Sequence, residues 1–134
     1  MRLTRRYRFS ASHRLDSEAM TPEENRRLYG KCNNPYGHGH DYWLEVSVEG
    51  PVDSNGQIVD RLALDDFVER RIIDRMNHRN LNVDVPELDG GVPTTENLAA
   101  AIRRMLEPEW DLPARLTRIR VAETDRNIFE LNCS

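Results

Sequence analysis

Leu3-Thr-Arg-Arg-Tyr-Arg-Phe-Ser-Ala-Ser-His13 is the stretch that decides the fold, because its apolar residues fall mainly at odd positions and its polar residues at even ones. Side chains alternate between the two faces of a β-strand, so this period of two predicts a half-buried strand. His13 is in phase with the apolar Tyr7, Phe9 and Ala11, which places its imidazole on the inward face. The first predicted element is therefore an amphipathic strand that ends in an inward-facing histidine.

The same alternation returns between Tyr42 and Val48 and predicts a second strand. The polar residues 16–31 predict a loop with a short helix at residues 22–28, and Cys32-Asn-Asn-Pro-Tyr-Gly-His-Gly-His40 is rich in residues typical of irregular backbone. Asp53-Ser-Asn-Gly56 is a turn sequence. We therefore expect a hairpin in which residues 57–60 form a short strand.

Downstream, the hydrophobic period changes. Apolar residues recur at intervals of three and four between Leu62 and Met76, which predicts an amphipathic helix of about four turns. A second helix follows Pro93-Thr-Thr-Glu-Asn97, with Thr94 as its N-cap and Glu96 in its electropositive first turn. Residues 116–123 and 127–131 predict two further strands around a tight turn.

This order of elements predicts an α+β fold, with a four-stranded antiparallel sheet and two helices on one face. The 134 residues suit a single domain spanning residues 1–134. Because the edge strands of so small a sheet are open to pairing, we expect the sheet to be closed by oligomerisation.

Composition and charge exclude several classes of function. The formal net charge of −4 does not favour binding to nucleic acid. No apolar run approaches the roughly 20 residues that span a bilayer. We therefore expect neither nucleic acid nor a membrane as a partner. The first residues lack the apolar core of a signal peptide, and the two cysteines are too few for a disulfide framework, which favours a cytoplasmic protein. The basic cluster Arg2, Arg5, Arg6 and Arg8 is interpreted as a solvated strand face.

His38 and His40 form a candidate chelating pair. They are one residue apart, so in extended backbone both imidazoles project to the same side. His13 could add a third nitrogen, giving a zinc site that keeps one position open for water or substrate. Two alternatives remain: His13 is only a hydrogen-bonded core residue, or Cys32 is the fourth ligand of a closed structural site.

Glu123 is a second unusual residue, because it is in phase with Ile119 and Val121 and so points toward an apolar face. A carboxylate there needs donors. Its two oxygens could accept parallel hydrogen bonds from a heterocycle with adjacent N–H groups. An internal ion pair with an arginine is the alternative.

Five segments of the chain resemble the 6-pyruvoyl-tetrahydropterin synthase and 6-carboxy-tetrahydropterin synthase family. They occur in order over nearly the whole sequence: Phe9-Ser-Ala-Ser-His-Arg-Leu15, Gly30-Lys-Cys-Asn-Asn-Pro-Tyr-Gly-His-Gly-His40, His78-Arg-Asn-Leu-Asn82, Pro93-Thr-Thr-Glu-Asn97 and Glu123-Thr. The resemblance implies the T-fold, or tunnelling fold, in which three subunits join their sheets into a barrel. It also implies a homohexamer formed as a dimer of trimers.

The resemblance also implies roles for individual residues. The zinc ligands would be His13, His38 and His40, and Cys32 would be the proton-abstracting cysteine with His78 as its partner. Glu123 would anchor the pterin, next to a pocket loop that contains Thr94 and Thr95.

Asn77 departs from the family pattern, which usually has an aspartate immediately before the catalytic histidine. An amide can fix the tautomer of an imidazole, but unlike a carboxylate it does not stabilise the imidazolium. We therefore expect His78 to be a weaker proton acceptor here. Asp74 or Asp66 could supply the missing carboxylate instead.

The activity implied by the resemblance is that of a zinc-dependent carbon–oxygen lyase. It would convert 7,8-dihydroneopterin triphosphate to 6-pyruvoyl-tetrahydropterin with loss of triphosphate, with Zn²⁺ as Lewis acid and Cys32 as a thiolate proton shuttle. Five residues separate Cys32 from His38, which resembles the pyruvoyl-forming branch, since the carboxy-forming branch typically has three.

Three alternative functions stay open from the sequence. One is a 6-carboxy-5,6,7,8-tetrahydropterin synthase on the route to queuosine and deazapurines. Another is a catalytically impaired, zinc-containing pterin- or purine-binding protein, which Asn77 suggests. The third is a nucleotide cyclohydrolase that shares the fold.

Overall fold

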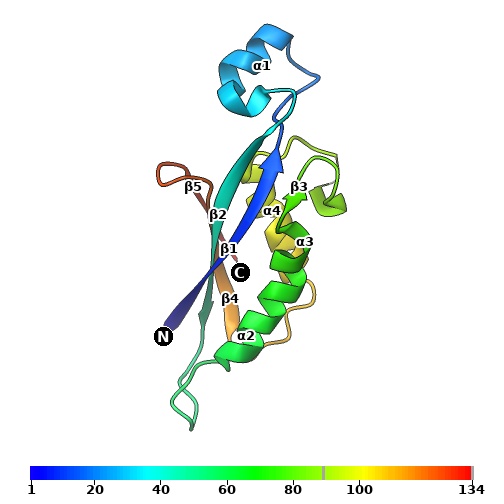
Figure 1. Cartoon of the computed structure of the whole chain (residues 1–134). Helices are drawn as coiled ribbons and strands as arrows, with labels where there is room; N and C mark the ends of the chain where they lie inside the picture. The colour runs from blue at the N-terminus through cyan, green and yellow to red at the C-terminus, as the bar shows by residue number, and fades with distance from the viewer. Residues whose placement is uncertain (89, 134) are drawn as a thin grey trace.

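The computed structural model describes residues 1–88 and 90–133, whose strands form one five-stranded sheet (Figure 1). The order across the sheet is β3-β1-β2-β4-β5. The strand bounds are Arg2–His13 for β1, His38–Glu49 for β2, Arg79–Asn80 for β3, Arg115–Ala122 for β4 and Ile128–Asn132 for β5. The four predicted strands are confirmed. The fifth, β3, was not predicted, because two residues are too few to show a hydrophobic period.

The pairing of β1 with β2 fixes one end of the sheet. The strands are antiparallel and in register over their full length, from Arg2 opposite Glu49 to His13 opposite His38. Their apolar side chains face the core, where Phe9 stacks on Tyr42 with ring centroids 5.1 Å apart. The register therefore brings the histidines of both strands to the same end of the sheet.

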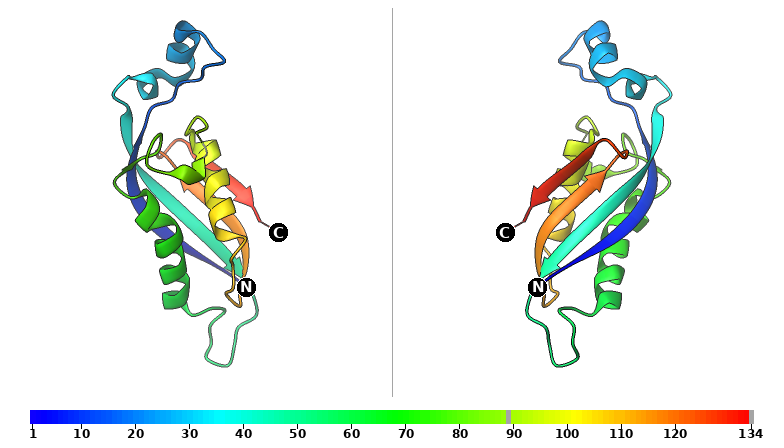
Figure 2. Two further views of the ribbon diagram at one scale, coloured as in Figure 1. Left: turned by 90° about the vertical axis from the view of Figure 1, so that its right-hand side faces the viewer. Right: turned by 90° about the vertical axis from the view of Figure 1, so that its left-hand side faces the viewer.

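One face of the sheet is covered by two helical segments (Figure 2). The first runs from α2 (Arg61–Val68) through a π-helical turn (η2, Glu69–Ile73) into α3 (Asp74–Met76), and the second is α4 (Thr95–Leu106). Both predicted helices are confirmed, and the N-cap of α4 is Thr94, whose Oγ1 accepts a 3.2 Å hydrogen bond from the Asn97 N–H. No helix among residues 1–88 and 90–133 has the length and apolar character needed to span a bilayer.

The predicted short strand at residues 57–60 is wrong. Asp60 instead caps α2, because its carboxylate accepts from the backbone N–H groups of Leu62 and Ala63. The preceding turn closes on itself, since the Asp53 N–H donates to the Gln57 carbonyl oxygen at 2.8 Å. Because Asp60 serves as this cap, the segment before it leads into the helix and does not form a strand.

Ion pairs join charged side chains of neighbouring strands. The carboxylate of Glu45 lies 3.4 to 3.6 Å from the guanidinium nitrogens of three arginines: Arg6, Arg118 and Arg120. The predicted basic cluster is paired as well: Arg2 with Glu49, Arg5 with Asp65, Arg6 with Glu45 and Arg8 with Asp41. Neighbouring carboxylates thus compensate these arginines.

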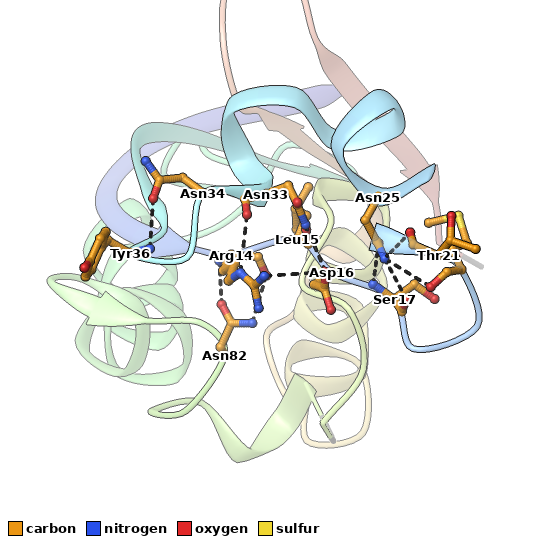
Figure 3. Close-up of polar contacts among 11 residues, drawn as sticks. Arg14, Leu15, Asp16, Ser17, Thr21, Asn25, Asn33, Asn34, Tyr36 and Asn82 are labelled. Carbon is orange, nitrogen blue, oxygen red and sulfur yellow. Dashed lines mark hydrogen bonds and ion pairs between the residues drawn. The ribbon is translucent and has the colours of Figure 1, made fainter. Parts of the chain in front are cut away.

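Residues 14–37 leave the sheet and return to it beyond the ends of β1 and β2 (Figure 1). They form α1 (Pro22–Tyr29), which confirms the predicted short helix, and the 3₁₀ turn η1 (Gly30–Asn33), in which Cys32 lies. Two buried asparagines hold this excursion (Figure 3). Asn25 bonds the backbone of Ser17 and Thr21.

The second buried asparagine, Asn33, fixes the residue next to Cys32. Its Nδ2 donates to the Leu15 carbonyl oxygen at 2.7 Å and to Asp16 Oδ1 at 3.0 Å. The Leu15 N–H in turn donates to the Cys32 carbonyl oxygen at 2.7 Å. The position of Cys32 therefore depends on a short hydrogen-bonded link to the end of β1.

We expect Asn33→Ala to lower the free energy of unfolding by about 1–3 kcal/mol, because it leaves the Leu15 carbonyl without its side-chain donor. Equilibrium urea unfolding measures the change. Asn34→Ala is the matched control, since Asn34 is exposed and its Oδ1 accepts only from the nearby Tyr36 N–H among the described residues. Equal unfolding midpoints for the two variants would show that Asn33 does not hold the excursion.

Candidate metal and catalytic centre

Four potential ligand atoms from different parts of the chain converge at the end of the sheet. They belong to His13 on β1, Cys32 in η1, His40 on β2 and Glu123 just after β4, and all lie within 4.8 Å of one another. Cys32 Sγ is 3.4 Å from His13 Nε2 and 3.6 Å from His40 Nε2. Glu123 Oε1 is 3.7 Å and 3.4 Å from the same two nitrogens. The cluster offers imidazole, thiol and carboxylate donors to one point.

The His13 ring is held by its other nitrogen. Its side chain is fully buried, and Nδ1 lies 2.9 Å from the Pro93 carbonyl oxygen. A carbonyl accepts only from a protonated nitrogen, so Nδ1 carries the hydrogen and Nε2 keeps a free lone pair toward Cys32 and Glu123. Tyr42 Oη, 3.3 Å from Nδ1, completes the surroundings. The sequence did not predict that Pro93 and Tyr42 contact His13, because both are distant from it along the chain.

Burial keeps the two clustered imidazoles neutral. It lowers the pKa of His13, with hydrogen bonding to Pro93 and the charge of Glu123 acting in the opposite direction. Burial likewise lowers the pKa of His40, again opposed by Glu123 and reinforced by His13 and His38. A neutral imidazole with a free Nε2 is the form that binds a metal ion. This donor chemistry fits zinc.

His38, the third predicted ligand, lies at the edge of this cluster. Its ring centroid is 4.7 Å from that of His40, but its nitrogens are not among the four converging donors, and the residue is exposed. Of the three predicted zinc ligands, the structure brings His13 and His40 together and leaves His38 beside them.

The Cys32 thiol is partly buried next to a carboxylate. Burial raises its pKa, and the negative charge of Glu123 raises it further. In the metal-free protein Cys32 is therefore a thiol, and forming the thiolate requires a nearby cation or base.

Glu123 faces inward as its strand phase predicts, with a side chain that is only 13% exposed. Within residues 1–88 and 90–133 its carboxylate lies close to the Nε2 atoms of the two neutral imidazoles and pairs with no arginine. The Asn127 Nδ2 donates to its other oxygen at 3.4 Å. The alternative of an internal arginine pair is thus not observed.

His78 lies on the other side of β1 from this cluster, in left-handed backbone with φ of 61°. Its N–H donates to the Ser10 carbonyl oxygen at 2.6 Å, and Asn77 Oδ1 accepts from the Ser10 N–H at 2.9 Å. Both residues are therefore tied to the edge of β1. Among the described residues no hydrogen bond joins Cys32 to either of them.

His78 lines a cavity of about 550 Å³ whose other walls include His40, Asp41 and Asp84. These two carboxylates were not predicted from the sequence. Of the predicted substitutes for the missing aspartate, Asp66 on α2 pairs with Arg70 in η2 at 2.9 Å. Asp41 and Asp84 therefore line the same cavity as His78.

The loop before α4 contacts the cluster through Pro93. Pro93 contacts His13, Thr94 caps the helix, and Thr95 is 3% exposed with no hydrogen-bond partner for its Oγ1 among the described residues. A buried hydroxyl without a partner costs about 1–3 kcal/mol.

Comparisons with known proteins point to one family. The family model described as 6-pyruvoyl tetrahydropterin synthase matches residues 2–133. A protein of Poecilia reticulata named 6-pyruvoyl tetrahydrobiopterin synthase is 46% identical over 94% of this chain and 86% of its own length. The Homo sapiens protein of the same name is 42% identical over 94% of this chain and 87% of its own length.

A solved structure gives the same result. The Caenorhabditis elegans 6-pyruvoyl tetrahydropterin synthase structure superposes with a TM-score of 0.90 at 36% identity, covering 100% of this chain and 96% of that one. Sequence and backbone thus agree over the whole chain.

The lowered pKa values predict how stability depends on pH. When the pH falls below the ordinary histidine pKa of about 6.5, the unfolded chain binds protons that folded His13 and His40 do not. The metal-free protein should therefore lose stability as the pH falls through that value toward the depressed pKa values. Urea unfolding in the presence of a chelator, at several pH values between about 5 and 8, measures this slope. His40→Gln should flatten it, and a slope equal to that of the original protein would contradict the assignment.

Proposed function

The chain belongs to the 6-pyruvoyl tetrahydropterin synthase family, and on this basis we propose that it is a zinc-dependent lyase that converts 7,8-dihydroneopterin triphosphate to 6-pyruvoyl-tetrahydropterin with loss of triphosphate. Its α+β architecture is the T-fold of that family. The observation that carries the proposal is the convergence of His13, Cys32, His40 and Glu123 on one point.

In this proposal His13, His38 and His40 hold the zinc ion. Neutral imidazoles, a His13 ring fixed through Nδ1, and the proximity of the His38 and His40 rings support the assignment. A bound zinc would act as a Lewis acid toward the substrate's side-chain oxygens. Three imidazoles leave a position open for substrate, whereas adding the Cys32 sulfur would close a tetrahedral site.

The remaining residues of the cluster then contact the substrate. The Glu123 carboxylate accepts from the amino and ring N–H groups of the pterin, because its two oxygens match two adjacent donors. Thr94 and Thr95, where α4 begins, are proposed to flank the pterin, and Pro93 next to them contacts the cluster through His13. Cys32 removes and returns protons at the side-chain carbons of the substrate.

His78, the proposed partner of Cys32, lies away from it within one chain, so we infer that a second copy completes the site. Both edges of the sheet are open to pairing: β1 meets β3 only at Ala11 and Ser12, and β5 pairs only with β4 among the described strands. A homohexamer formed as a dimer of trimers would use these edges. The free thiols Cys32 and Cys133 are consistent with a cytoplasmic location.

Mass spectrometry of the products made from 7,8-dihydroneopterin triphosphate and zinc tests the activity. We expect 6-pyruvoyl-tetrahydropterin and free triphosphate. A 6-carboxy product would establish the other branch instead, and pterin binding without turnover would establish a binding protein in which Asn77 has weakened His78.

Cys32→Ala should abolish turnover and leave the zinc content at about one ion per chain, because the sulfur is proposed to carry protons and not to bind the metal. Zinc is measured by atomic emission spectrometry and turnover by triphosphate release. Cys133→Ala, the matched control at the chain's other thiol, should keep both. Loss of zinc from Cys32→Ala would make Cys32 a ligand.

Glu123→Gln should weaken binding of a pterin ligand such as neopterin by about 2–3 kcal/mol, because the amide places a donor opposite a donor. Isothermal titration of the zinc-loaded protein gives the affinity. Zinc content should not change. An unaltered affinity would remove Glu123 from the pterin site.

A further inference from the structure

A second cavity, of about 730 Å³, lies where the excursion of residues 14–37 meets the start of β2. Three cationic side chains line it: Arg14, Arg26 and Lys31. Asp16 is the only acid among its lining residues. This concentration of positive charge contrasts with the net charge of −4 of the whole chain.

Two of these cations lack an internal counter-charge. Arg26 and Lys31 form no ion pair within residues 1–88 and 90–133, whereas the arginines on β1 are all paired. Asp16 is already engaged, since its Oδ1 lies 3.6 Å from Arg14 Nη2 and accepts from Asn33 Nδ2. The cavity therefore presents positive charge that the described residues do not neutralise.

One wall of the cavity, formed by Arg14 and Asn33, is fixed by hydrogen bonds (Figure 3). The Arg14 N–H donates to Asn82 Oδ1 at 2.7 Å, and Asn82 Nδ2 donates back to the Arg14 carbonyl oxygen at 2.9 Å. Arg14 Nε also donates to the Asn33 carbonyl oxygen at 3.4 Å. A ligand would therefore meet a pre-formed wall, which reduces the entropy lost on binding.

The cavity adjoins the four-donor cluster. His38 lines it, and the His38 ring lies 4.7 Å from that of His40 in the cluster. Lys31 and Asn33, which also line it, flank Cys32 in η1. A molecule bound at the cluster could extend directly into this basic space.

We propose that this cavity is the polyphosphate subsite, which binds the triphosphate group of the substrate and the triphosphate that is released. The proposal rests on the function proposed above, which requires a place for this group. Guanidinium groups match phosphate oxygens in a bidentate geometry, and the lysine adds a compact positive charge. The same chemistry would accept a free inorganic polyphosphate.

Isothermal titration of inorganic tripolyphosphate into the zinc-loaded protein tests the subsite. We expect binding, and we expect the double variant Arg26→Gln with Lys31→Gln to weaken it by about 100-fold, roughly tenfold for each charge-assisted contact removed. Arg27→Gln is the matched control, since Arg27 lies on the same helix but does not line the cavity. Lys31→Arg should retain binding. An unchanged affinity in the double variant would overturn the proposal, as would an original protein that does not bind tripolyphosphate.

Steady-state kinetics separates the subsite from the proposed function. Tripolyphosphate should inhibit competitively against the pterin triphosphate, and the double variant should raise KM for it while leaving the affinity for phosphate-free 7,8-dihydroneopterin unchanged. If the original protein makes pyruvoyl product and the double variant keeps its KM, the subsite alone is wrong. If no product forms but tripolyphosphate binding depends on Arg26 and Lys31, the function is wrong and the cavity is a site for free polyphosphate.

Discussion

The register between β1 and β2 is the constraint on which the rest of the site depends. A shift of one residue would turn every side chain of a strand to the opposite face, so His13 or His40 would leave the cluster. The register is fixed by burial along the whole pair of strands, including the stack of Phe9 on Tyr42. Hydrophobic packing far from the metal centre thus sets which imidazoles meet.

The excursion between these strands adds the chemistry that the sheet lacks. It delivers Cys32 to the two imidazoles, and it forms the wall of the basic cavity with Arg26 and Lys31. Its shape is held by buried asparagines that bond backbone groups. The paired strands therefore supply the histidines that are proposed to bind the metal. The hydrogen-bonded excursion supplies the residues that are proposed to contact the substrate.

Hydrophobic periodicity predicted the four long strands and the helices, because each covers enough residues to show its period. It missed β3 and the π-helical turn within residues 61–76, which are set by tertiary contacts. Strand phase correctly placed His13 and Glu123 inward. It did not separate His38 from His40, which are in phase, because their distance from the strand end decides how close each ring comes to the cluster: His38 is the first residue of β2 and is exposed.

The electrostatics of the site were less predictable from the sequence. The thiolate expected at Cys32 depends on a nearby cation, and in the metal-free chain burial and the charge of Glu123, a residue distant along the chain, raise the pKa of Cys32. The separation of His78 from Cys32 likewise depends on which side of β1 each residue reaches. Motifs identify the chemical groups, while packing sets their charge states and distances.

Zinc K-edge X-ray absorption of the protein loaded with one zinc per chain tests the central claim most directly. We expect nitrogen and oxygen neighbours at about 2.0–2.1 Å, from the three imidazoles and a water molecule, and no sulfur neighbour. A sulfur neighbour at about 2.3 Å would place Cys32 on the metal and contradict a site that is open to substrate.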